Sequence, residues 1–104
     1  MTDPVKAITR RISRRCGSLA TLELRDQRSA PWRSLLFNGA HHRIGLTLFG
    51  DHVKKAVDAL EAEISDADFA ISGHIVAELK IVEVDYIDTA ALVTIDALTI
   101  EEGC

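Results

Sequence analysis

The residues of this chain best able to do chemistry are its four histidines, two of which are adjacent at His41 and His42. Imidazole binds metal ions and exchanges protons near neutral pH. Neighbouring residues on a strand point to opposite faces of a sheet, so this pair is not expected to bind one ion together. The sequence also contains no HxH or HxxxH spacing, which zinc sites commonly use. A histidine site would therefore have to be assembled by the fold from separate elements.

One such assembly follows from the topology that we expect. If the strand before the second helix and the strand after it run parallel, joined by a crossover, then His42 and His74 lie at the same end of the sheet. The last strand returns to that end and brings Glu101, followed by Glu102 and Cys104. Imidazole and carboxylate are both zinc ligands. His42, His74 and Glu101 are thus candidates for a metal or acid–base site, and the alternative is that these strand-end side chains are solvated.

Nucleophilic catalysis has less support in the sequence. Cys16 falls at the C-terminal end of the first expected helix, where the helix dipole raises the pKa of a thiol and weakens it as a nucleophile. No serine lies in a GxSxG elbow, and no glycine-rich loop follows a strand as a phosphate cradle would. Cys16 and Cys104 lack CxxC spacing and are expected to be free thiols in a reducing compartment. We expect no catalytic residue and no cofactor.

Charge is divided unevenly along the chain. Residues 1–44 contain nine Lys/Arg and three Asp/Glu, a net charge of +6, and residues 45–104 contain three and thirteen, a net charge of −10. The basic half can contact the acidic half within one molecule or across a dimer, or it can face an anionic partner. We favour the first because it needs no other molecule. The interface or anionic-partner candidates are the cations of the first expected helix: Lys6, Arg10, Arg11, Arg14 and Arg15.

The elements that must position these residues follow from the apolar periodicity. Apolar residues at helical spacing predict helices over about 3–16 and 51–65, capped by Asp3 and Asp51. Period-two alternation predicts five strands, at 18–26, 32–37, 40–49, after Gly73, and at 91–100. Asn38-Gly39 is the pair most suited to a tight hairpin turn. We therefore predict one α+β domain over residues 1–104, with two helices on one face of a mostly antiparallel five-stranded sheet, in the order αβββαββ.

The first two-thirds of this order, helix, three strands and helix, is similar to that of a double-stranded-RNA-binding domain. Those domains carry a Lys-Lys-x-Ala-Lys run at the start of the second helix, and Lys54 and Lys55 stand at a comparable place here. The third basic position is Asp58, and further acidic residues leave the helix net negative. Phosphate affinity depends on net cationic contacts, so this surface is wrong for RNA.

These observations predict a small, non-enzymatic interaction or structural module that forms a homo-oligomer and has a possible protein partner. The first alternative is binding of nucleic acid or another anionic partner through the basic helix, although the net charge of −4 argues against nucleic acid. The second alternative is a small enzyme or metal-binding domain that uses the histidine end of the sheet. No apolar run spans a bilayer and no apolar signal core is present, so we expect a soluble, cytoplasmic protein without a membrane association.

Overall fold

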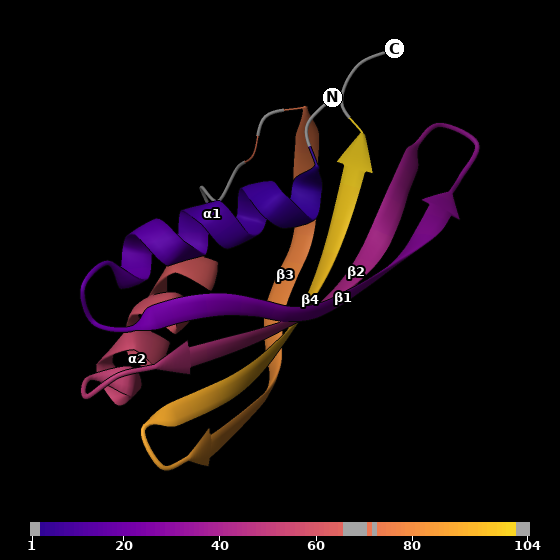
Figure 1. Cartoon of the computed structure of the whole chain (residues 1–104). Helices are drawn as coiled ribbons and strands as arrows, with labels where there is room; N and C mark the ends of the chain where they lie inside the picture. Colours follow the sequence, from indigo (N-terminus) through magenta and orange to yellow (C-terminus); the bar gives the residue numbers. More distant parts are fainter. Residues whose placement is uncertain (1–2, 66–70, 72, 102–104) are drawn as a thin grey trace.

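The computed structural model describes residues 3–65, 71 and 73–101. Two helices lie on one face of a four-stranded antiparallel sheet, in the order αββαββ along the chain and β1-β2-β4-β3 across the sheet (Figure 1). The predicted α+β class and the two helices are confirmed, whereas the fifth strand is not formed. The elements are α1 (Pro4–Cys16), β1 (Thr21–Arg33), β2 (Asn38–Phe49), α2 (Val53–Ile64), β3 (His74–Ile87) and β4 (Ala90–Glu101).

Helix α1 begins and ends where its sequence predicts. The Asp3 carboxylate accepts hydrogen bonds from the backbone N–H groups of Val5 and Lys6, and Pro4 occupies the first helical position. Gly17 ends the helix at a positive φ of 54°. The apolar stripe is buried along its whole length, at Val5, Ile8, Ile12 and Cys16.

Helix α2 is slightly shorter than predicted. His52, rather than Asp51, stands at its N-cap, and no side chain caps the helix there. The residues buried against the sheet and α1 are Val53, Ala56, Val57 and Leu60, as the helical spacing predicts. The phase of the amphipathic pattern was therefore sufficient to identify the buried face, whereas the capping position was wrong.

The first two predicted strands are one long strand, β1. Residues 27–31, expected to be a polar connection, pair with β2 without interruption. Pro31 is tolerated because β1 is an edge strand, where no second ladder requires its missing N–H. The hairpin turn lies at residues 34–37, where the Ser34 N–H donates to the Phe37 carbonyl, and not at Asn38-Gly39. Gly39 instead lies within β2, where a Cβ atom would collide with the Thr99 carbonyl of β4.

The last strand occupies the centre of the sheet rather than an edge. Strand β4 pairs with β3 on one side and with β2 on the other, antiparallel to both. Strands β2 and β3 therefore run in the same direction, as predicted, and β4 lies between them. The physical reason lies in the short β3–β4 turn, which returns the chain antiparallel to β3, and in the apolar alternation of β4, which is buried at Ala91, Val93, Ile95, Ala97 and Thr99.

The core lies between the helices and the two central strands, and both edge strands are irregular. Register shifts interrupt β1 at Leu24/Asp26 and β3 at Val76/Glu78 and Ile81/Glu83. The change of apolar phase at Val82 predicts the last of these bulges. Neither of the two helices in the described part of the chain covers the opposite face of the sheet, which we call the open face (Figure 1). No helix among residues 3–65 and 73–101 is long and apolar enough to cross a membrane.

Candidate functional site

The fold brings His42, His74 and Glu101 to one end of the sheet, as the topology argument predicts. His74 is the cross-strand partner of Glu101 in the β3–β4 ladder. His42 pairs with Ala97 in the β2–β4 ladder, two residues before Thr99. These three residues lie at the same end although the sheet has four strands rather than the expected five, because β2 and β3 run in the same direction. His52 lies at the other end, at the start of α2.

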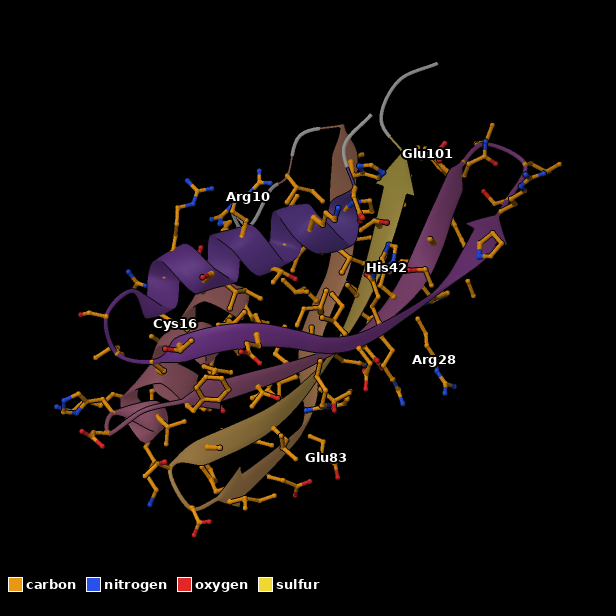
Figure 2. The ribbon with its side chains drawn as sticks, in the orientation of Figure 1. Arg10, Cys16, Arg28, His42, Glu83 and Glu101 are labelled. Carbon is orange, nitrogen blue, oxygen red and sulfur yellow. The ribbon has the colours of Figure 1, made fainter. Side chains whose placement is uncertain are left out.

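His42 is buried, at 5% exposure, and both of its ring nitrogens are occupied. Its Nδ1 lies 2.7 Å from the Ser29 hydroxyl, and its Nε2 lies 2.8 Å from the Thr99 hydroxyl. The imidazole therefore joins β1, β2 and β4 beneath the N-terminal end of α1 (Figure 2). Burial lowers the pKa of His42, the nearby His74 and His41 lower it further, and the Asp3 carboxylate opposes them. These hydrogen bonds leave neither nitrogen available to a metal.

His74 is arranged differently. It lines a cavity of about 340 Å³ with Asp3, Thr99 and Glu101, and its buried Nδ1 has no hydrogen-bond partner among the described residues. Asp3 already caps α1 through one carboxylate oxygen. Within residues 3–65, 71 and 73–101, no three His, Cys, Asp or Glu side chains are placed to hold a metal ion together. Glu102 and Cys104, which we associated with this end, lie outside the described residues.

The His42 network predicts a loss of stability in mild acid. Because the folded-state pKa is lowered, the unfolded chain binds a proton near pH 6.5 that the folded chain still excludes. The free energy of unfolding should therefore fall as the pH drops below about 6.5, with a slope of at most about 1.4 kcal/mol per pH unit, and the fall should end at the lower folded-state pKa. Urea denaturation at several pH values between about 7.5 and 5 measures this dependence of the free energy of unfolding on pH.

The matched variant is His42→Gln, which keeps polar atoms in the network but does not titrate. Its stability should depend less steeply on pH than that of the wild type. Identical pH dependence in the two proteins would contradict the assignment of the acid sensitivity to His42.

The basic helix is divided between paired and exposed cations. Arg11 Nε lies 2.7 Å from Glu63 Oε1, and Arg15 Nε lies 3.6 Å from Glu63 Oε2, so two of its arginines contact the acidic helix α2. This is the contact between basic and acidic halves that the charge distribution predicts within one molecule. The remaining members, Lys6, Arg10 and Arg14, are exposed along α1 (Figure 2 labels Arg10).

Cys16 offers no accessible thiol. It is a buried free cysteine whose Sγ lies 3.7 Å from the Ala56 carbonyl of α2. Burial raises the pKa of the thiol, which favours the unreactive protonated form. Cys104 lies outside the described residues.

Two groups of open-face residues were not identified as sites from the sequence. One is apolar and lies at the hairpin end of the sheet, where Trp32 faces Gly39, Gly39 faces Ile100 and Ile100 faces Ile75 across the four strands. The other is a charged row across the middle of the sheet, formed by Arg28, Arg43, Asp96 and Lys80. The alternating pattern of each strand indicates which face these residues occupy, but only the pairing register of the strands shows that they are neighbours.

Comparison with known proteins adds no relative: the chain matches no protein-family model, no curated protein and no solved structure.

Proposed function

We propose that this domain is a non-enzymatic interaction module that associates with a second copy of itself through one apolar surface. This surface, the hairpin-end patch, consists of the β1–β2 turn and the adjoining open-face row: Trp32, Leu35, Leu36, Phe37, Ile75 and Ile100. Binding rather than catalysis is supported by the state of the two reactive side chains described above. The Cys16 thiol is buried, and both His42 nitrogens are hydrogen-bonded.

The observation that carries the proposal is the exposure of the β1–β2 turn. Leu35 is 103% exposed and Leu36 is 83% exposed, and Phe37 beside them is also exposed. The turn lies at the end of a hairpin that extends beyond the helices (Figure 1), in a molecule 47 Å long and 22 Å wide. Contiguous exposed apolar residues on a projecting element are typical of protein–protein contact sites.

The composition of the patch favours a second copy as the partner. Its members are apolar, and the charged residues that end the flanking strands, Arg33 and Glu101, alternate with Trp32 and Ile100 and so project from the other face of the sheet. A two-fold dimer places the same surface of both copies in contact, so one apolar patch would cover the other.

Association by strand addition has less support. The free edges belong to β1 and β3, and both strands contain bulges, while β1 also contains Pro31. Bulges and proline are features that prevent edge-to-edge pairing. The strand at 91–100 offers no free edge for pairing, because β4 is central. The proposal therefore depends on the hairpin-end patch and not on a sheet edge.

Light scattering on the purified chain tests the proposal. The wild type should have twice the chain mass at micromolar concentration, as expected for an interface of about 1,000 Å² or more. In the double variant Leu35→Ser/Leu36→Ser, the dissociation constant of the dimer should be at least about tenfold higher than in the wild type. The reason is that truncating a central apolar contact typically costs more than about 1 kcal/mol of binding free energy. Both leucines are exposed in the monomer, so the folding stability of the monomer should not depend on them.

The matched control is Ile87→Ser, which removes an apolar side chain that is 55% exposed at the opposite end of the sheet. This variant should retain the mass of the wild type. A wild type that is monomeric at micromolar concentration would refute the proposal. Equal dissociation in the control and in the double variant would place the interface elsewhere.

A further inference from the structure

A row of charged side chains crosses the middle of the open face. In the β1–β2 ladder Arg28 is opposite Arg43, in the β2–β4 ladder Arg43 is opposite Asp96, and in the β3–β4 ladder Lys80 is opposite Asp96. Each of the four strands contributes one residue. Figure 2 shows Arg28 directed away from the helices, as its place in the row requires.

The members of this row are not equally partnered. Arg43 donates from Nε and from a terminal nitrogen to the two oxygens of Asp96, at 2.8 and 3.0 Å. Lys80 Nζ lies 3.1 Å from Glu78 Oε1 on its own strand. Arg28 has no hydrogen bond or ion pair among the residues that the structure describes. It nevertheless lies directly across from a second guanidinium.

Two like charges directly opposite on neighbouring strands are unfavourable. The Arg43 guanidinium is held by Asp96, and the Asp96 carboxylate is two strands away from Arg28. The repulsion between the arginines is therefore not offset by the Arg43–Asp96 pair alone. An anion placed between Arg28 and Arg43 would offset it, because arginine provides several N–H donors in a fork suited to oxyanions.

The space for such an anion is present. A hollow of about 560 Å³ is lined by residues of all four strands, including Arg28, His41, Arg43 and Lys80. Its volume is within the range of about 300–1,000 Å³ typical of small-molecule sites. With Glu78 and Asp96 included, the three Lys/Arg side chains leave the lining one positive charge in excess. The ligand class that fits is a small anion.

We propose that this hollow binds the phosphoryl group of a small molecule, held between Arg28 and Arg43. A phosphoryl group has three terminal oxygens and a charge between about −1.5 and −2 at neutral pH. It can therefore accept hydrogen bonds from both guanidiniums at once and neutralise both. A carboxylate has two acceptor oxygens and one charge, and a nucleic-acid phosphodiester also has one charge, so both are expected to bind more weakly.

Calorimetric titration of the full chain tests the site, with glycerol 3-phosphate as the probe and inorganic phosphate, succinate and a single-stranded oligonucleotide as comparisons. Glycerol 3-phosphate and inorganic phosphate should bind. Arg28→Gln should weaken both at least about tenfold, as expected when one charge-assisted contact is removed. In an amide NMR spectrum, the shifts caused by phosphate should centre on residues 28–30 and 41–43.

The matched control is Arg33→Gln, which removes an exposed arginine from the same strand but outside the hollow, and which should bind phosphate as the wild type does. Without ligand, Arg28→Gln should melt at the same temperature as the wild type or higher, because it removes a like-charge pair. Failure of the wild type to bind phosphate, equal weakening by both variants, or a lower melting temperature of Arg28→Gln would overturn the proposal. Tighter binding of succinate or of the oligonucleotide would overturn the assignment to a phosphoryl group.

Discussion

Replacing Leu60 by alanine should lower the free energy of unfolding by about 2–5 kcal/mol, the usual range for truncating a buried leucine. Leu60 is 0% exposed and lies on the face of α2 that packs into the core. The substitution removes apolar contacts and leaves a cavity that the central strands cannot fill, since β2 and β4 are held by neighbours on both sides. Urea denaturation followed by circular dichroism measures the change.

The neighbouring residue provides the control. Glu61 is exposed on α2, so Glu61→Ala should change the free energy of unfolding by less than about 0.5 kcal/mol. The two residues share a helix turn and differ mainly in burial. If the two variants shifted the denaturation midpoint equally, the packed face of α2 would be misassigned.

Replacing Gly39 by alanine should lower the free energy of unfolding by about 2–3 kcal/mol, as expected for inserting a methyl group into a close-packed position. A Cβ atom at Gly39 would meet the carbonyl of Thr99 and the adjoining backbone of Ile100. This backbone cannot move aside easily, because β4 pairs with β2 and β3. The substitution must separate the two central strands at the hairpin end. Chemical denaturation of the purified variant gives the cost.

Gly45→Ala tests whether the cost depends on the contact rather than on the loss of a glycine. Gly45 lies on the same strand and the same face of β2, but its Cβ would meet the side chains of Asp26 and Arg25, which can rotate away. Alanine is also the better residue within a strand, by about 0.5–1 kcal/mol. Gly45→Ala should therefore cost less than about 1 kcal/mol. Equal costs at the two positions would show that the approach of β2 to β4 is not the limiting contact.

The helices could be predicted from sequence because the signals that form them are local. The spacing of Val5, Ile8 and Ile12 and the Asp3–Pro4 start are contained within one helix. The buried face of α2 follows in the same way. The Asn38-Gly39 signal was misleading because glycine is suited to two tasks, a turn with positive φ and a close approach of backbones. Nothing within the hairpin itself shows that the backbones of β2 and β4 approach closely at Gly39.

The arrangement of the strands depended on residues far apart in the chain. The polar segment at 27–31 has no strand signal of its own, yet β2 offers it an unbroken row of backbone partners. The position of β4 between β2 and β3 is favoured because its alternating apolar residues are buried under both helices only at the centre. A strand pattern reports which faces are apolar, but it does not report the neighbour on either side.

By itself the sequence determined the α+β class, both helices and their buried faces, and the shared end of the sheet where His42, His74 and Glu101 lie. It also predicted contact between the basic and acidic halves of the chain, within one molecule or across a dimer, and the structure shows such a contact between Arg11 and Glu63. The tertiary structure alone decided that His42 is enclosed by Ser29 and Thr99, and that Arg28 faces Arg43. The reason is physical: periodicity determines the direction of a side chain, whereas cross-strand register, set by long-range packing, determines what it meets.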